Sequence, residues 1–585
     1  MVRSAVTQAG LPGASVTLAG TTIGVSADSV GHYRITDIPP GVYTVSFQSL
    51  GYERLTTPDI AVDGDRVIQL DAELQPIAIE TAPVLVMGTY FRKAPDAPTS
   101  VFQLDADEVR RLPGSAGDLS RILSVLPSTA RVSDRLNDLV VRGGSPFENG
   151  FNVDGIHIPN INHFPVQGSS AGPIGLLNTE LVEDVRFYSG GFPVEFGDRL
   201  SSITDIRLRE GRRDGFAAQT DVSVAGFGAT LEGPLSSRGA WLISGRRSFF
   251  EVIEKPLDLE AVPEFEDIHA KISFDANQQN RFVLLNIYAS SATEWSEEVS
   301  EDRGWAQYGD MAARQNTAGL VWRRLWGPTA HTETSVSYAS IKYEDEWLFT
   351  RGDDTSRSNN SLEAALRVQS TSTIRPNDRH AVTVGGEFTR RIDDLEYHYD
   401  RIVGIIARPI PETRIDRRFH TTTAALFASH TWSPSPRVSA TAGLRADHFC
   451  LTDRVLWAPR VSARVEPAPR LAVNAAFGVF HQNLPMFILA QSDRNRNLRA
   501  PTAIHSVLGF DYALSDAASL TVEFYDKEYH HFPLEPKNPR RFVIDDAVTL
   551  EGFVPYEDLV DNGRAWARGV EMLLQKRSGR GLNYL

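Results

Sequence analysis

From about residue 212 to the end of the chain, hydrophobic and polar residues alternate one by one in short segments. Because successive side chains of a β-strand point to opposite faces, a period of two predicts strands with one apolar and one charged face. Residues 519–527 (SLTVEFYDK) and 460–466 (RVSARVE) show it clearly. The segment AKISFDA divides in the same way, with Ala270, Ile272 and Phe274 opposite Lys271, Ser273 and Asp275. We count about fifteen such segments, roughly 25 residues apart with their loops, which is too regular for separate globular domains.

Two architectures fit strands of this kind. One is a soluble sandwich with its charges in water, and the other is a barrel with lipid outside and water inside. Aromatic residues near segment ends favour the barrel, where they form girdles at the membrane interfaces. The tryptophans concerned are Trp295, Trp322, Trp326, Trp347 and Trp432. No run of residues approaches the roughly 18 apolar residues of a transmembrane helix.

Three acidic segments interrupt the alternation, at residues 294–305, 343–354 and 390–401. Short proline-rich sequences such as SPSPR and EPAPR lie between other segments. In a membrane barrel, loops are long at one end and turns are short at the other. The acidic segments are therefore predicted to be long outward loops.

The first part of the chain has a different organisation. Residues 1–75 contain short alternating segments separated by Gly, Pro and Asp clusters, at the spacing of a β-sandwich. Residues 76–94 form a linker, and residues 95–210 read as a compact α/β domain with glycine-rich turns. Within that domain a helix is predicted after Asp118, its N-cap, from the apolar spacing of Leu119, Ile122, Leu123 and Leu126. Residues 211–585 would form the barrel.

Composition excludes several classes of function. The chain carries 59 basic and 74 acidic residues, a net charge of −15, which disfavours nucleic-acid binding. Cys450 is the only cysteine, so an internal disulfide, a cysteine-ligated zinc site and an iron–sulfur cluster are excluded. The first residues lack the apolar region of a secretory signal. We expect that the original start was lost by truncation.

No catalytic constellation emerges from the motifs, and neither an enzyme nor a cofactor is expected. Residues 168–172 (GSSAG) satisfy G-x-S-x-G, but no strand precedes Ser170 as a nucleophile elbow requires. No H-E-x-x-H sequence occurs, and His530 and His531 form an isolated pair. No metal site is predicted.

Several segments resemble known families. The pattern LPGASVTLAGT…GHYRITDIPPGVYTVSFQSLGYE resembles the carboxypeptidase regulatory-like domain. The segments LVVRGGSPFENGFNVDGIHIPNINHF and ELVEDVRFYSGGFPVEFGDRLSSITDIRLREG resemble the plug domain of TonB-dependent outer-membrane receptors. LRAPTAIHSVLGFDYALSDAASLTVEFYDKEYHHF is similar to a barrel hairpin of that family.

The resemblance implies a mostly β protein with three parts. These are a transthyretin-like β-sandwich, an α/β plug and a large antiparallel transmembrane β-barrel. The barrel would be truncated, with about 15 of about 22 strands, and the location would be the bacterial outer membrane.

In the plug, Gly143 and Gly144 are expected to form one tight turn and Asp154 and Gly155 another, because glycine permits close backbone approach. Arg142 is expected to pair with a carboxylate of the plug or of the barrel wall.

The family is driven by TonB, an inner-membrane protein that grips a short extended segment by adding it to its own sheet. The candidate for that segment is residues 80–88 (ETAPVLVMG). The residues expected to contact TonB are Glu80, Thr81, Val84, Leu85 and Val86.

Ligand contact is expected at the plug apex, residues 158–170, through Asn162, His163 and Phe164. The implied function is energised uptake of a bulky solute such as an iron chelate. The implied partners are TonB, the extracellular solute and outer-membrane lipid, with a monomeric barrel. The alternative is a non-transporting surface or periplasmic β-protein that binds glycans.

Overall fold

The computed structural model describes residues 1–75, 100–249, 263–537 and 558–576, together with residues 539, 543 and 556. Short gaps in these ranges fall at residues 6, 19–20, 22, 40, 50–51, 53–54, 63–67, 112–116, 132–135, 223–225, 351–354, 401, 404–408, 411 and 516–517.

The N-terminal domain is a small β-structure with a core of its own. Its main sheet has the order β3-β2-β4-β5, formed by Gly24–Ser26, Ser15–Leu18, Gly41–Gln48 and Leu55–Val62. A second, parallel pair joins β1 (Val2–Ser4) to β6 (Ala72–Leu74). Apolar residues from both sheets, among them Val16, Phe47 and Leu74, are almost fully buried between them.

The plug is built on a five-stranded sheet of order β11-β10-β15-β14-β7. Its strands are Ile156–Ile158, Asn149–Val153, Ser202–Leu208, Val182–Tyr188 and Val101–Asp105. Smaller pairs are β8 (Thr129–Arg131) with β9 (Leu139–Val141) and β12 (Asn162–His163) with β13 (Ile174–Gly175). Helix α1 spans Ala106–Arg111, and short 3-10 turns span Pro146–Glu148 and Thr179–Leu181.

The helix predicted after Asp118 is present as α2 (Leu119–Leu123). One carboxylate oxygen of Asp118 accepts hydrogen bonds from the backbone N–H groups of Ser120 (2.8 Å) and Arg121 (3.4 Å). The other oxygen accepts from Asn137 Nδ2 at 2.6 Å and from the N–H of Gly175 at 2.8 Å. The cap therefore also ties α2 to the rest of the plug.

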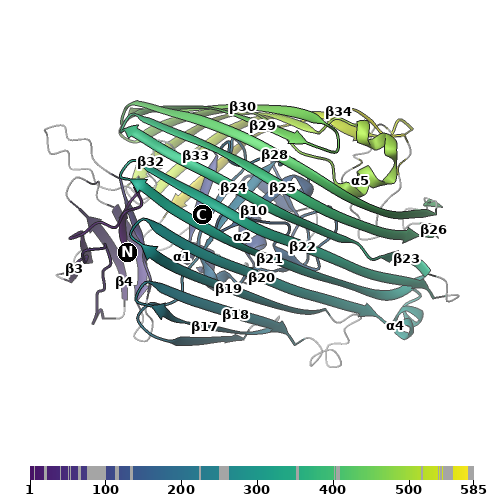
Figure 1. The fold of residues 1–585 in the computed structure, drawn as a ribbon, viewed down its shortest axis with the longest axis horizontal. Coiled ribbons are helices and arrows are strands. Elements are labelled where there is room, and N and C mark those ends of the chain that lie inside the picture. The colour runs from purple at the N-terminus through teal and green to yellow at the C-terminus, as the bar shows by residue number, and fades with distance from the viewer. Residues whose placement is uncertain are drawn as a thin grey trace.

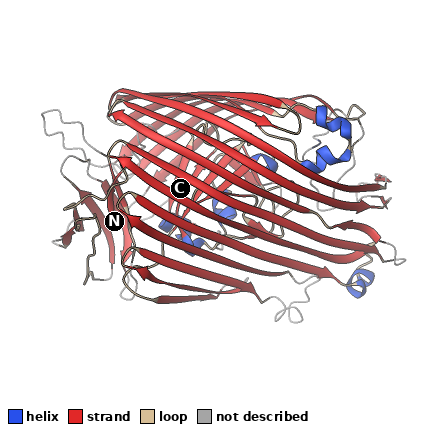
Figure 2. Ribbon diagram, viewed as in Figure 1, coloured by secondary structure: helices blue, strands red, loops and turns tan. Residues whose placement is uncertain are grey.

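The wall around the plug is one antiparallel sheet (Figures 1 and 2). It has seventeen strands within the described residues. The sequence predicted about fifteen. In sheet order they are β16 (Ala217–Val222), β17 (Gly226–Ser236), β18 (Gly239–Ser248), β19 (Glu264–Asn277), β20 (Asn280–Trp295), β21 (Gln307–Gly327), β22 (Ala330–Phe349), β23 (Thr355–Asn359), β24 (Leu362–Asn377), β25 (His380–Tyr399), β28 (Thr413–Ser435), β29 (Val438–Phe449), β30 (Arg454–Ala468), β31 (Leu471–His481), β32 (Thr502–Ser515), β33 (Ala518–Leu534) and β34 (Val560–Lys576). A two-residue pair, β26 (Ile402–Val403) and β27 (Pro409–Ile410), lies apart from this sheet.

The two faces of the wall decide between the architectures left open by the sequence. Outward-facing Leu426 is 73% exposed and Met572 is 64% exposed. Inward-facing Glu523, Lys527 and Arg445 are at most 3% exposed. A soluble sandwich would bury the first set and expose the second. The reversed arrangement is that of a membrane barrel with an apolar outer band and a polar interior.

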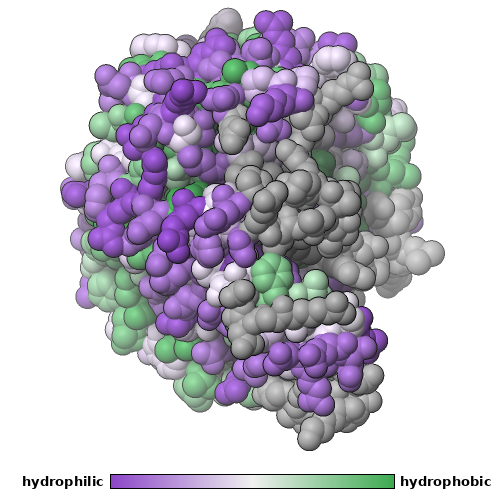
Figure 3. Space-filling view, turned by 90° about the vertical axis from the view of Figure 1, so that its right-hand side faces the viewer, coloured by the Kyte–Doolittle hydropathy of each residue, from purple (hydrophilic) through white to green (hydrophobic). Residues whose placement is uncertain are grey.

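The two ends of the barrel differ. Connections are short at the end where the N-terminal domain lies, for example at residues 277–280 and 327–330 (Figure 1). Connections at the other end are long and include α4 (Glu297–Asp302), α5 (Met486–Gln491) and the 3-10 turn η3 (Asp493–Asn497). Seen from that end, the described surface is mostly polar, with hydrophobic residues along the sides (Figure 3). Long loops mark the extracellular end, so the N-terminal domain lies on the periplasmic side.

Among the described helices, none is both long and apolar enough to cross a membrane.

Two of the acidic segments do not form the loops predicted from sequence. Strand β22 continues to Phe349 and β25 to Tyr399, so residues 343–349 and 390–399 are strand. These segments are strand because β22 and β25 are longer than the membrane requires. A strand needs about 9–11 residues to cross lipid, and each of these strands has 20. The remaining residues extend past the lipid, where both faces tolerate charge. The first segment, residues 294–305, does contain the connection that carries α4.

Candidate functional site

The plug is joined to the wall by several buried polar contacts, and one of them lies at Arg142. This residue follows β9 and has a positive φ of 48°, as does Gly143 at 72°. The left-handed turn directs the Arg142 side chain from the plug toward β33 and β34. A Cβ at Gly143 would lie 2.9 Å from the Ala567 side chain of β34, and one at Gly144 would overlap Ser201. Both glycines therefore allow the turn to approach its neighbours closely.

Arg142, Ser100, Glu523 and Glu571 form what we call the Arg142 cluster. Arg142 donates from Nε to Glu571 Oε1 at 3.0 Å and from Nη2 to Glu571 Oε2 at 2.6 Å. The same Nη2 donates to Glu523 Oε2 at 2.5 Å, and Nη1 donates to Ser100 Oγ at 3.1 Å. Ser100 Oγ donates in turn to Glu523 Oε2 at 2.7 Å. The pairing with a carboxylate that the sequence led us to expect is thus made twice, both times with the barrel wall.

The cluster is shielded from water, which makes its electrostatics strong. The side chains of Arg142, Glu523 and Glu571 are only 1%, 3% and 9% exposed. Burial by itself lowers the pKa of Arg142, but the hydrogen bond to Glu571 and the charge of Glu523 outweigh it, so the pKa lies above its usual value. The guanidinium stays charged and binds two wall strands to one plug turn.

A second buried contact lies beside the first. Lys527 of β33 donates from Nζ to Ser201 Oγ at 2.7 Å and to the carbonyl of Val141 at 3.3 Å. Tyr529 of the same strand donates its hydroxyl to Glu148 Oε2 at 3.0 Å. Strand β33 thus holds the plug at several points along one inward face.

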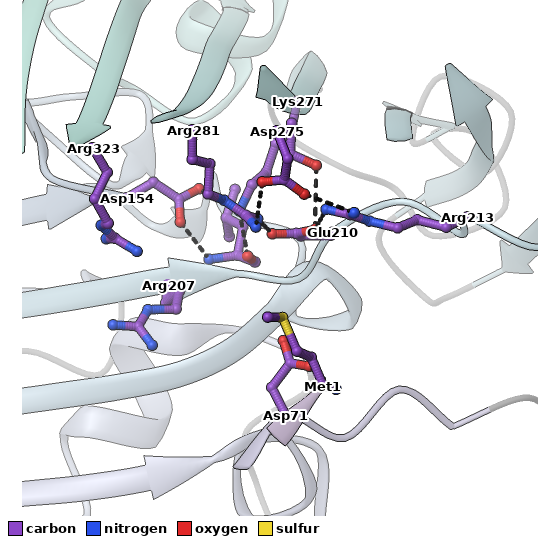
Figure 4. A network of polar contacts seen from close by, with 12 residues as sticks. Met1, Asp71, Asp154, Arg207, Glu210, Arg213, Lys271, Asp275, Arg281 and Arg323 are labelled. Atoms are coloured by element: carbon purple, nitrogen blue, oxygen red, sulfur yellow. Dashed lines mark hydrogen bonds and ion pairs between the residues drawn. The ribbon is translucent and has the colours of Figure 1, made fainter. Parts of the chain in front are cut away.

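The turn between β10 and β11 makes a third contact. Asp154 and Gly155 have positive φ values of 50° and 80°. Asp154 Oδ2 lies 2.9 Å from Lys271 Nζ of β19 (Figure 4). A Cβ at Gly155 would come within 2.8 Å of Glu333 of β22. The expected turn is present, and it abuts the wall.

A network of alternating charges surrounds the point where the plug continues into the barrel (Figure 4). Glu210 pairs with Arg281 and lies 3.2 Å from Arg213. Asp275 lies 2.8 Å from Arg213 and 3.2 Å from Arg281. The network fixes the plug exit to the hairpin formed by β19 and β20.

The three residues predicted at the plug apex are buried against the wall. Asn162, His163 and Phe164 are 1%, 0% and 5% exposed. The His163 ring lies 3.0 Å from Asp267 Oδ2 through Nε2 and 3.0 Å from Ser291 Oγ through Nδ1. Burial lowers the pKa of His163, against the attraction of Asp267. In this structure these residues join plug to wall rather than lining an open mouth. Their contact with a ligand stays a prediction.

The segment predicted to bind TonB, with Glu80, Thr81, Val84, Leu85 and Val86, lies outside the described residues.

Sequence reasoning missed the wall partners of the plug, chiefly Glu523, Glu571 and Asp267. A signal did exist, because the alternation placed Glu523 and Lys527 on the polar face of their strand. The alternation does not indicate which plug residue contacts Glu523 and which contacts Lys527.

Models of three families match the chain. The carboxypeptidase regulatory-like domain matches residues 1–75, the TonB-dependent receptor plug domain residues 93–202, and the TonB-dependent receptor-like β-barrel residues 266–584. A curated relative, the TonB-dependent transporter Oar of Myxococcus xanthus, is 26% identical over 253 residues. That match covers 38% of this chain and only 23% of Oar.

Solved structures share the fold at low identity. The siderophore receptor PirA of Pseudomonas aeruginosa is 15% identical, with a TM-score of 0.60 over 83% of this chain and 82% of its own. A mutant of the ferric enterobactin receptor PfeA of the same organism is 14% identical, with a TM-score of 0.61 over 82% of this chain and 78% of its own. The outer-membrane transporter YddB of Escherichia coli is 13% identical, with a TM-score of 0.55 over 76% of this chain and 71% of its own.

The barrel model alone covers more than half of the chain, and the model of the plug domain matches just before it. The chain therefore belongs to the TonB-dependent receptors, a family of outer-membrane β-barrel proteins that carry a plug domain.

Proposed function

We propose that this receptor takes up a bulky solute, such as an iron chelate, across the outer membrane in an energised step. The observation that carries the proposal is the set of buried polar contacts that hold the plug inside the seventeen-stranded wall. Barrels of about this many strands enclose an aqueous channel, which the plug would close. A solute can pass only when these contacts are released. The structurally similar PirA proteins are named siderophore receptors, which supports the choice of cargo class.

The energy would come from TonB, acting on residues 80–88. TonB would add this segment to its own sheet through backbone hydrogen bonds. Support comes from the geometry just after the segment. Ser100 belongs to the Arg142 cluster, and the strand that follows it, β7, is an edge strand of the plug sheet within the described residues. A pull on residues 80–88 would reach the cluster and this edge strand first.

The apolar outer faces of the strands support outer-membrane lipid as the surrounding medium. We also propose that the receptor acts as a monomer, since plug, wall and the contacts between them all come from one chain.

Deleting residues 80–88 is expected to abolish uptake while leaving solute binding intact, because the segment precedes both the plug and the barrel wall in the sequence. The measurement compares accumulation of radiolabelled iron(III) chelates in cells with binding at the cell surface in the cold. Val84→Pro should act like the deletion, since proline removes a backbone donor from the added strand, whereas Val84→Thr should be tolerated. Uptake that survives the deletion would refute the role of this segment.

A further inference from the structure

The N-terminal domain is docked at the periplasmic end of the molecule and presents carboxylates there (Figure 1). Its last strand, β6, divides between two environments. Ala72 and Leu74 are at most 1% exposed and belong to the hydrophobic core of the domain. Asp71 and Glu73 alternate with them in the sequence, so their side chains point away from that core.

Arginines of the plug and of the wall surround Glu73. Its Oε1 lies 3.9 Å from Nη1 of Arg207 on β15 and accepts a hydrogen bond of 3.1 Å from Nε of Arg3 in the domain itself. Burial raises the pKa of Glu73, but the charges of Arg3 and Arg207 outweigh it. Arg186 of β14 and Arg323 of β21 act in the same direction, so the pKa lies below its usual value. Plug and wall thus present positive charge to a carboxylate of the domain.

A second ion pair joins the domain to the start of the barrel. Nη2 of Arg34 lies 3.2 Å from Oδ2 of Asp214, in the connection between the plug strand β15 and the first wall strand β16. Asp214 also accepts two hydrogen bonds from Arg212, at 3.0 Å and 3.1 Å. The docked domain therefore contacts the plug sheet through Glu73 and the beginning of the wall through Arg34, and it ties the two together.

This docking depends on charge and not on apolar packing. The hydrophobic cluster of the domain contains only residues 2–74, and the clusters of plug and wall begin at residue 101, so no cluster crosses the contact within the described residues. The side chains of Arg34 and Arg207 are 62% and 34% exposed. Exposed ion pairs stabilise little and are screened by salt. Domains joined without a large apolar interface move relative to one another, so the docking is reversible.

We propose that the N-terminal domain is a reversible electrostatic clamp on the periplasmic face of the receptor, and that it undocks before the plug moves. The inference rests on the proposed function in one respect, since it takes TonB to pull on residues 80–88. These residues lie between β6 and β7 in the sequence, so on one side the pull acts on the domain. On the other side it acts on the Arg142 cluster, whose side chains are at most 9% exposed. The exposed ion pairs are the weaker hold and yield first.

The docking can be tested without solute or TonB. In the Cys450→Ser receptor in lipid vesicles, spin labels at Thr17→Cys in the domain and at Gln278→Cys in a turn of the wall report their separation. Both native side chains are exposed. We expect a narrow distance distribution in dilute buffer and a broad one in about 1 M salt, where the screening length falls to about 3 Å. Arg34→Glu combined with Glu73→Gln should give the broad distribution even in dilute buffer.

Two controls accompany the distances. Arg238→Glu makes a charge reversal at the same end of the wall, and Arg238 donates to the carbonyl of Ala276 and not to the domain, so the distribution should stay narrow. Labels at Ser15→Cys and Gln48→Cys, which pair across β2 and β4, report whether the domain keeps its fold. A distribution that stays narrow in salt and in the double variant would overturn the electrostatic clamp. A broad distribution in the parent in dilute buffer would overturn the docking itself.

The need to undock is tested by linking the domain to the barrel. In the same background, a reductant-cleavable bifunctional thiol reagent would join Arg34→Cys to Asp214→Cys. The linked receptor should accumulate radiolabelled iron(III) chelates as poorly as the receptor that lacks residues 80–88, and reductant should restore uptake. Linking Ser15→Cys to Gln48→Cys within the domain should leave uptake unchanged.

Undiminished uptake by the receptor linked between domain and barrel would overturn the requirement for undocking. Absence of uptake even without the link would instead contradict the proposed function. The spin-label distances involve no transport, so they decide the clamp in either case.

Discussion

Replacing Arg142 with methionine is expected to release the plug from β33 and β34 and to make the barrel leaky. The substitution leaves Glu523 and Glu571 buried without their cation. Removing one partner of a buried ion pair costs about 3–5 kcal/mol. The leak would be measured as sensitivity of cells to a large antibiotic that the outer membrane normally excludes, and as channel conductance in planar bilayers.

Matched variants separate the charge imbalance from a loss of packing. Arg142→Met combined with Glu523→Gln and Glu571→Gln should leak much less than Arg142→Met alone, because no buried charge is left uncompensated. Arg142→Lys keeps the charge but cannot make the two parallel bonds to Glu571, so an intermediate leak is expected. A single Arg142→Met variant as tight as the parent would show that the cluster does not hold the plug.

Leu426→Arg is expected to impair insertion of the barrel strongly. This side chain lies on the outer face of β28 and is 73% exposed. Arginine near the middle of a bilayer costs about 2–4 kcal/mol on the lipid face of a barrel. The loss would be measured as reduced folding into lipid vesicles from urea, followed by the heat-modifiable gel shift.

The control lies on the same face of the same strand, ten residues closer to the extracellular end. Asp416 is exposed there and is flanked on that face by Arg414 and Arg418. Asp416→Arg should have little effect, since these charges mark the strand as having left the lipid. Equal effects at both positions would mean that Leu426 does not face lipid.

The features that the sequence predicted well are those determined by residues close together in the sequence. Alternation alone divided residues 519–527 into an outer face with Phe524 and an inner face with Glu523 and Lys527, and the burial agrees. The α2 helix began at its expected cap because Asp118 acts on backbone groups only two and three residues away. The pairs Gly143–Gly144 and Asp154–Gly155 located the plug turns for the same reason.

The features that were missed depend on distant partners. Arg142 meets glutamates 381 and 429 positions away, and His163 meets an aspartate 104 positions away. The residues next to His163 in the sequence do not indicate whether its side chain contacts the barrel wall or lies at an open plug apex. The acidic side chains of residues 343–349 predict a loop, but they suit a strand that has left the membrane equally well. The burial of residues 486–490 was not predicted, because a short apolar run is informative only together with the distant residues that it packs against.

The most direct test of the central claim, that the apolar face of the strands meets lipid while the polar face encloses the plug, is a labelling scan along β28. Single cysteines at residues 424–429 in the Cys450→Ser receptor would carry spin labels in lipid vesicles. Collisions with oxygen report lipid, and collisions with a water-soluble nickel chelate report water. We expect lipid exposure at Ala424, Leu426 and Ala428 and none at Ala425 and Phe427, in keeping with their burial. Lipid exposure at Ala425 and Phe427 instead, or no alternation at all, would contradict the barrel.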